Sequence, residues 1–244
     1  MEIEIYSDVV CPWCYLGTAR LQRALTTSDL HDDVVLRWRA FQLDPSAPAV
    51  GEPLLPWLAP RFGGVDRARQ VQAHVSALAE AEGLELDFER ALIANTFDAH
   101  RLLWFADLPE AVMFGATADT QPELAEALYR AHFTDGLDVS SHEVLTGLAA
   151  DVDLDPDRVG EFLATNEGTA DVRGQLAHAY DLGINAAPTF IFAGKYAVSG
   201  ARAVEEFTSV LTEVARRERL TSTTSALIPQ QRRAPAPEDD TRVS

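Results

Sequence analysis

Residues 2–14 read EIEIYSDVVCPWC and carry the clearest structural pattern in the chain. Residues 2–9 alternate between apolar and polar side chains and are rich in β-formers, which predicts a strand. The Cys-Pro-Trp-Cys motif at 11–14 then opens a helical pattern, and Pro12 suits a first helical turn because its missing N–H is no loss there. A second strand is predicted at 34–41. This order of strand, helix and strand indicates a βαβ unit with parallel strands.

The rest of the chain has mainly helical patterns. Residues 45–62 are rich in Pro and Gly, and we expect an irregular segment there. Apolar periodicity and glycine stops predict helices near residues 66–82, 87–105, 122–133, 141–150, 156–164 and 168–182. Strand patterns return at 189–192 and 196–198, with Gly194-Lys195 as the turn of a hairpin, and a last helix is predicted at 203–219.

These elements predict an α/β chain in which both ends, residues 1–44 and 184–220, build one domain around an inserted helical domain at 45–183. The remaining tail, 221–244, combines Ser and Thr with Pro and acidic residues and has almost nothing apolar after Ile228. Packing such a segment would not offset the entropy lost on ordering it, so we expect the tail to be disordered.

Composition and charge exclude several classes of partner. The chain has 244 residues, of which 47% are hydrophobic and 24% charged, so it can bury a full globular core. Acidic residues outnumber basic ones by 38 to 20, and the net charge of −18 repels nucleic acid and anionic membrane surfaces. No apolar run is long enough to span a bilayer, and the strand pattern that follows Met1 leaves no room for a signal peptide. We therefore expect a cytoplasmic protein, acting as a monomer or homodimer.

The two cysteines, Cys11 and Cys14, form a Cys-x-x-Cys pair at the predicted helix start. Cys11 faces unpaired backbone N–H groups and the positive end of the helix dipole, which favour its thiolate and make it the candidate nucleophile. Cys14 lies one turn deeper on the same side and is the candidate resolving thiol. A zinc site would need further ligands, yet the chain has no third cysteine and no His-x₃₋₅-His. A structural bridge remains an alternative, although structural disulfides are rare in the cytosol.

Four ordered motifs resemble the DsbA-family thioredoxin-fold oxidoreductases, specifically their FrnE-like branch. The motifs are Ser7-Asp-Val-Val-Cys-Pro-Trp-Cys-Tyr-Leu-Gly17, Asn95-Thr-Phe-Asp-Ala-His-Arg-Leu102, Ala187-Pro-Thr-Phe190 and Val198-Ser-Gly-Ala201. The resemblance covers residues 2–220. It implies a thioredoxin fold with a helical domain inserted between the βαβ unit and a C-terminal ββα unit, in agreement with the order of elements predicted above.

The same resemblance implies a cis peptide bond between Ala187 and Pro188, placed beside the cysteine pair. In the resembled enzymes the residue before this proline pairs with a bound peptide, so Ala187 and Pro188 become the candidate substrate-binding residues. The sequence also allows the alternative that Pro188 merely opens an edge strand. Asp8 can serve the N-terminus of the helix, which its position favours, or relay protons to the thiols, whereas a lone His100 in a helix is more typical of packing or of a surface.

The predicted function is thiol–disulfide exchange with a protein or small-thiol substrate, in either direction. No bound cofactor is expected, and glutathione is a candidate redox partner. Two alternatives stay open. Glutathione-dependent isomerases or transferases of the 2-hydroxychromene-2-carboxylate isomerase and kappa-class type share the scaffold but usually carry serine where Cys11 stands. A non-catalytic partner-binding or chaperone module is the second alternative.

Overall fold

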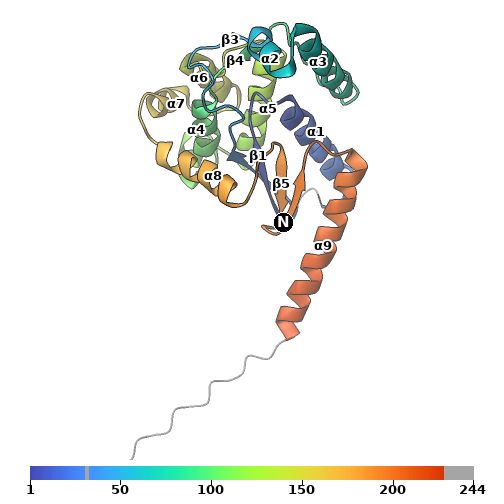
Figure 1. The fold of residues 1–244 in the computed structure, drawn as a ribbon. Coiled ribbons are helices and arrows are strands. Elements are labelled where there is room, and N and C mark those ends of the chain that lie inside the picture. Colours follow the sequence, from blue (N-terminus) through green and yellow to red (C-terminus); the bar gives the residue numbers. More distant parts are fainter. Residues whose placement is uncertain (31–32, 228–244) are drawn as a thin grey trace, which may run out of the picture.

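A four-stranded sheet lies at the centre of the protein in the computed structural model, which describes residues 1–30 and 33–227 and, for 221–227, only the backbone helix. Its strands are β1 (Glu2–Ser7), β2 (Val35–Ala40), β5 (Thr189–Phe192) and β6 (Tyr196–Ser199), in the order β2-β1-β5-β6. β1 and β2 are parallel, whereas β5 runs antiparallel to both β1 and β6. The predicted βαβ unit and the C-terminal hairpin therefore join in one sheet (Figure 1).

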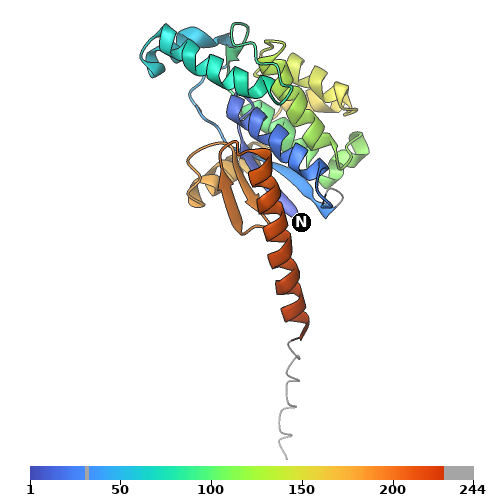
Figure 2. The ribbon, with the colours of Figure 1, turned by 90° about the vertical axis from the view of Figure 1, so that its right-hand side faces the viewer.

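Strand alternation distributes the apolar residues over both faces of this sheet. Ile3 and Ile5 belong to a core that includes side chains of helices α1 (Pro12–Thr26) and α9 (Val204–Leu227), and these helices lie side by side (Figure 2). Tyr6 points to the opposite face and packs with residues of β5 and of helix α8 (Thr169–Asp181). The sheet is thus covered by helices on both faces.

All remaining helices of the described chain come between β2 and β5, as the α/β prediction with an inserted helical segment requires. They are α2 (Leu54–Phe62), α3 (Val65–Glu80), α4 (Phe97–Ala106), a 3₁₀-helix (Pro109–Phe114), α5 (Thr120–Phe133), α6 (His142–Asp151), α7 (Pro156–Leu163) and α8. None of the helices in the described part of the chain is long and apolar enough to cross a membrane. The domain bounds at 1–44, 45–183 and 184–220 stay a prediction.

The helix predicted at 87–105 is wrong over its first ten residues, because the helix begins only at Phe97. Before it, the chain runs as turns and a short strand, β4 (Leu92–Ile93), which pairs antiparallel with β3 (Glu52–Pro53). The side chain of Asn95 accepts a hydrogen bond from the Phe97 N–H at 3.0 Å. Pairing with a distant segment therefore outweighed the local helical periodicity.

The prediction of an irregular segment at 45–62 is confirmed for residues 45–51 and wrong for its second half, which helix α2 occupies. Pro56 lies in the first turn, where its missing N–H leaves no hydrogen bond unmade, although Pro60 lies inside the helix. Gly63 ends the helix in the left-handed region, with φ of 81°. Proline content alone was therefore a misleading signal for loop structure here.

Helix α9 is longer than predicted and extends to Leu227, past the expected end at residue 219. No Gly or Pro interrupts residues 201–228, so nothing in the backbone chemistry stops the helix at Thr221. The disordered tail predicted from residue 221 is therefore wrong for residues 221–227. The rest of that prediction, residues 228–244, lies outside the described residues.

Candidate functional site

The cysteine pair occupies the N-terminus of α1. Cys11 is the N-cap residue with extended backbone angles, and its carbonyl accepts hydrogen bonds from the N–H groups of Cys14 and Tyr15 at 3.0 and 3.2 Å. Pro12 follows as the first helical residue, as predicted. No side chain caps this helix end. Cys11 therefore lies beside the free N–H groups and the positive end of the helix dipole.

The two thiols differ in their surroundings. Cys11 exposes 3% of its surface and lines a cavity, whereas Cys14 exposes none. Burial, together with the hydrogen bond and charge of the neighbouring Cys11, raises the pKa of the Cys14 thiol well above its usual value. The prediction that Cys14 is the shielded thiol is confirmed. Catalytic roles for Cys11 and Cys14 stay predictions.

The Ala187–Pro188 segment lies directly against Cys11. The Cys11 thiol donates a hydrogen bond to the Ala187 carbonyl, with 3.7 Å between sulfur and oxygen. The Ala187–Pro188 peptide bond is cis, as the family resemblance implied. The edge-strand alternative is wrong, because β5, which follows Pro188, lies between β1 and β6. Gly17 of α1 makes this approach possible, since a Cβ there would lie only 3.0 Å from Pro188 Cγ.

Asp8 does not serve the helix N-terminus through its side chain, contrary to the favoured prediction. Only its backbone carbonyl contacts the helix start, accepting a hydrogen bond from the Cys11 N–H at 3.0 Å. Its carboxylate accepts a hydrogen bond from the Leu43 N–H at 2.7 Å, and its other oxygen lies 3.5 Å from His100 Nε2. Both side chains are 1% exposed. His100 is thus buried, and α4 brings it to Asp8 near the cysteine pair.

These two residues belong to a set of buried polar groups, which we call the polar cluster. Its members are Ser7, Asp8, Trp38, His100, Tyr129 and His132, and each has a side-chain atom without a hydrogen-bond partner among the described residues. Burial and the nearby Cys14 raise the pKa of the Tyr129 hydroxyl well above its ordinary value. Burial lowers the pKa of His132 to about 4, so this imidazole is neutral near neutral pH.

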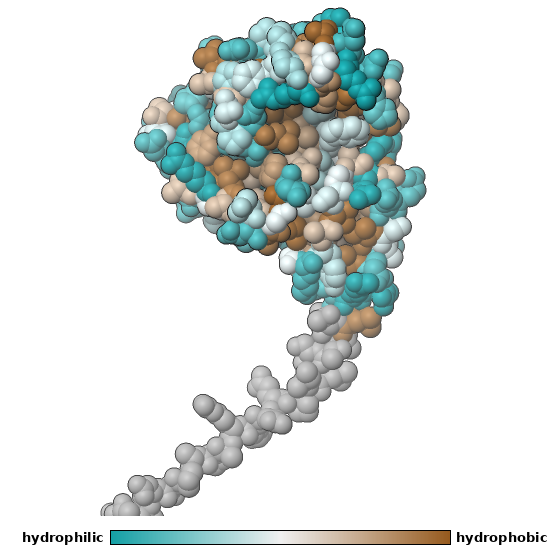
Figure 3. Space-filling view, in the orientation of Figure 1, coloured by the Kyte–Doolittle hydropathy of each residue, from teal (hydrophilic) through white to brown (hydrophobic). Residues whose placement is uncertain are grey.

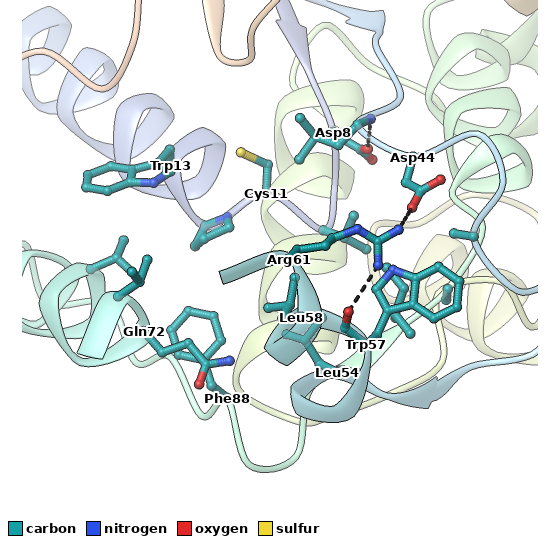
Figure 4. A pocket seen from close by; sticks show the side chains of 18 of the residues that line it. Asp8, Cys11, Trp13, Asp44, Leu54, Trp57, Leu58, Arg61, Gln72 and Phe88 are labelled. Carbon is teal, nitrogen blue, oxygen red and sulfur yellow. Dashed lines mark hydrogen bonds and ion pairs between the residues drawn. The ribbon is translucent and has the colours of Figure 1, made fainter. Parts of the chain in front are cut away.

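A cavity of about 350 Å³ opens beside Cys11, and Asp8 and Ala187 are among the residues that line it. Its walls come from the start of α1, from α2 and α3, and from residues 88–96 (Figure 4). Most of them are apolar, and apolar side chains gather around a hollow within a polar rim on the face shown in Figure 3. The residues that sequence analysis missed are mainly here: Leu54, Trp57, Leu58, Arg61, Gln72, Val75 and Phe88. Their spacing carries no motif, because they come from three separate segments.

Arg61 is the one positively charged residue among the described residues that line this cavity. Its guanidinium group already has partners within the protein. It forms an ion pair with Asp44 at 2.8 Å and donates a hydrogen bond to the Trp57 carbonyl at 3.0 Å (Figure 4). Its Cζ atom also lies 4.6 Å from the centre of the Trp57 ring, in a cation–π contact. These contacts hold the Arg61 side chain against Asp44 and Trp57, so that it forms part of the cavity wall.

Comparisons with known proteins agree with this geometry. Residues 2–212 match the model of the DSBA-like thioredoxin domain family. A crystal structure of a probable DsbA oxidoreductase, SCO1869 from Streptomyces coelicolor, is 32% identical, with a TM-score of 0.79, over 99% of this chain and 94% of that one.

No group of three or more His, Cys, Asp or Glu residues in the described part of the chain could hold a metal ion.

Two further structures share the fold at lower identity. The cytosolic disulfide reductase DsbM from Pseudomonas aeruginosa is 16% identical, with a TM-score of 0.58, over 88% of this chain and 99% of that one. A 2-hydroxychromene-2-carboxylate isomerase is 17% identical, with a TM-score of 0.57, over 93% of this chain and 100% of that one. Because both kinds of enzyme share the fold, its shape alone does not separate the two chemistries.

Proposed function

Since the chain belongs to the DSBA-like thioredoxin domain family, we propose that it is a thiol–disulfide oxidoreductase with Cys11 and Cys14 as its redox pair. One observation carries the proposal. Cys11 lies at the N-terminus of α1 beside an open cavity, while Cys14 is fully buried behind it. An attacking thiol needs access and a stabilised thiolate, whereas a resolving thiol needs only to reach the first one.

The reaction proceeds in two exchanges. The Cys11 thiolate attacks one sulfur of a substrate disulfide, the S–S bond breaks, and the other substrate sulfur leaves as a thiolate. Cys14 then loses its proton and attacks the Cys11 sulfur, and the second substrate thiolate leaves. The substrate gains two electrons, and Cys11 and Cys14 lose two as they form a disulfide. The reverse sequence oxidises a substrate dithiol.

Burial favours the neutral thiol of Cys14, because it raises the pKa of that group. The second exchange therefore needs a proton acceptor or a transient loss of burial. Asp8 lies close enough for its charge to act on Cys14, and one of its carboxylate oxygens lies 3.5 Å from His100 Nε2 without a hydrogen bond between them. We assign to Asp8 the role of receiving the Cys14 proton, with His100 positioning its carboxylate.

The proposed setting is the cytoplasm, with a protein or small-thiol substrate and glutathione as the redox partner that resets the pair. The fold shared with a cytosolic disulfide reductase supports this setting. The proposed enzyme works without a bound cofactor, because the two sulfurs carry the electrons, and it acts as a monomer or homodimer. The reduction potential of the Cys11–Cys14 pair against glutathione separates a reductant from an oxidant.

The decisive test compares Cys14→Ser and Cys11→Ser proteins on a disulfide substrate. With Cys14→Ser, a mixed disulfide between Cys11 and the substrate should accumulate and should disappear on adding reductant. With Cys11→Ser, no such complex should form and turnover should cease. Val112→Ser, at an exposed position of the 3₁₀-helix, is the control for general effects of substitution.

The same variants distinguish thiol–disulfide exchange from the isomerase alternative. A glutathione-dependent isomerase needs one positioned group and no resolving thiol, so Cys14→Ser would leave isomerase turnover intact. Assaying disulfide exchange and isomerisation of 2-hydroxychromene-2-carboxylate in parallel distinguishes the two. Full disulfide-exchange turnover by the Cys14→Ser protein, with no trapped intermediate, would exclude the two-thiol mechanism.

A further inference from the structure

The cavity beside Cys11 has features that the exchange of sulfur bonds does not require. Thiol exchange needs only that two sulfurs meet, yet here a cavity of about 350 Å³ continues past Cys11 between α1, α2 and α3. This volume is at the lower end of the range of small-molecule pockets. Trp13, Trp57, Leu58 and Phe88 give it large apolar walls (Figure 4). Its shape and chemistry fit an apolar group larger than a methyl.

One uncharged polar side chain in the wall has a nitrogen atom without a hydrogen-bond partner among the described residues. Gln72, on α3, is 8% exposed and lines the cavity, and its amide Nε2 has no hydrogen-bond partner among the described residues (Figure 4). A buried donor without an acceptor costs free energy, which an acceptor brought by a ligand would recover. The ligand that fits best therefore combines an apolar body with a carbonyl oxygen.

The charges in the wall disfavour an anionic ligand. Arg61 is already paired with Asp44 and packed on Trp57, so its charge is balanced within the wall. Asp8 and Asp44 both line the cavity, and the whole chain carries a net charge of −18. A carboxylate entering here would lose hydration and would meet like charges in return.

We propose that this cavity is a specificity pocket for an apolar side chain next to the reacting cysteine of a polypeptide substrate, whose carbonyl accepts a hydrogen bond from Gln72. This inference rests on the proposed function. The cysteine sulfur reaches Cys11, the neighbouring side chain enters between Leu58 and Phe88, and the carbonyl of that same residue meets Gln72 once the side chain is seated. Glutathione, with two carboxylates, exchanges at Cys11 without occupying the pocket.

The experiment uses oxidised peptides with one variable residue beside cysteine, placed before it in one series and after it in another. The residue is Leu, Phe, Ala or Glu, and the rate of oxidation of the reduced full-length protein is followed by alkylation and mass spectrometry. In at least one series, Leu and Phe should react about tenfold faster than Ala, because a large apolar side chain is buried. Glu should react more slowly than Ala.

Two variants test the pocket itself. Gln72→Met keeps the size and removes the donor, and it should lower the ratio of the Leu rate to the Ala rate about threefold to tenfold. Leu58→Glu should remove the preference, so that the Leu and Ala peptides react at equal rates. Val112→Glu adds the same charge at an exposed position outside the cavity lining and should leave the ratio unchanged.

A competition experiment tells whether the cavity binds the apolar side chain of a peptide or glutathione. S-methylglutathione, which cannot exchange, should not slow the reaction of the Leu peptide. If it does so at millimolar concentration, the cavity is a glutathione site and the inference is overturned. Equal rates for Leu, Ala and Glu in both series would also overturn it while leaving the proposed function intact. If no peptide reacts, the proposed function itself fails, together with the inference that depends on it.

Discussion

Two regions of different character adjoin the cysteine pair, the apolar cavity beside Cys11 and the polar cluster near Cys14, and Asp8 belongs to both. The cavity wall combines half-exposed side chains, such as Leu58 and Phe88, with buried ones, such as Leu54, Gln72 and Val75. The polar cluster is made of buried side chains from β1, β2, α4 and α5 and from Asp8, which follows β1. Both regions depend on the helical segment between β2 and β5, which supplies one side of each.

The difference explains how two thiols three residues apart acquire different tasks. On the cavity side, the open space leaves room for a substrate, so half-exposed side chains such as Leu58 contribute little to stability. In the polar cluster, burial controls ionisation, and removing a side chain leaves either a void or an unpaired charge. We therefore expect changes in the cluster to alter stability and protonation, and changes in the cavity to alter substrate choice.

The largest expected effect is at Tyr129, in the polar cluster. Its ring is fully buried and stacked on Tyr15, with 5.0 Å between ring centres. Tyr129→Ala should lower the free energy of unfolding by about 3 to 5 kcal/mol, because it opens a large void. Tyr129→Phe, its matched control, keeps the ring and should cost less than about 1.5 kcal/mol. Denaturant unfolding measures both, and equal losses would contradict this account of the cluster.

The next effect is the acid sensitivity that His132 brings to the folded state. Its pKa of about 4 in the folded protein lies below the ordinary histidine value of 6.5, so the unfolded chain binds more protons between these values. Its contribution is fully present above pH 6.5 and is lost as the pH falls toward 4, by about 3 kcal/mol in all.

His132→Leu tests this assignment, because it removes the titrating group and places an apolar side chain of similar size beside Phe133. The difference in unfolding free energy between wild type and variant should change with pH over this window and be constant above it. His178→Leu, at an exposed imidazole of α8, is the matched control. A pH-independent difference for His132→Leu would show that another group titrates.

A smaller effect is expected on the protonation of Cys14. Burial is the main cause of its raised pKa, and the charge of Asp8 adds to it. Asp8→Asn in a Cys11→Ala background should therefore lower the pKa of Cys14 relative to Cys11→Ala alone. Asp44→Asn, in the cavity wall, should leave it unchanged. Thiolate absorbance against pH measures both, and equal shifts would remove the distinction between the two carboxylates.

The smallest effect on stability is expected in the cavity wall. Leu58 is only half-buried, so Leu58→Ala should lower the free energy of unfolding by less than about 1.5 kcal/mol, well below the range typical of fully buried leucines. Leu102→Ala, in the fully buried core, is the matched comparison and should cost about 2 to 5 kcal/mol. Thermal and denaturant unfolding of the two proteins should differ clearly. Similar losses would mean that the wall is part of the rigid core.

Local patterns were sufficient for the sheet and for the cysteine pair. Strand alternation at 2–9, the Cys-x-x-Cys motif with Pro12, and the hairpin after Pro188 each lie within a few residues and follow backbone chemistry that needs no distant partner. For this reason the helix start at Cys11 and the shielding of Cys14 were predicted correctly. The α/β order of elements followed from the same signals.

Contacts between distant segments set the rest. The strand pairing of Pro53 with Leu92 replaced a predicted helix, and α4 carries His100 to Asp8 across 92 positions in the chain. The cavity has no motif, because Leu58 and Gln72 face Cys11 only after α2 and α3 have packed near α1. Periodicity reports which face of an element is apolar but not which element covers it. The sequence pattern therefore revealed the reacting sulfurs, whereas long-range packing created the environments that make them different.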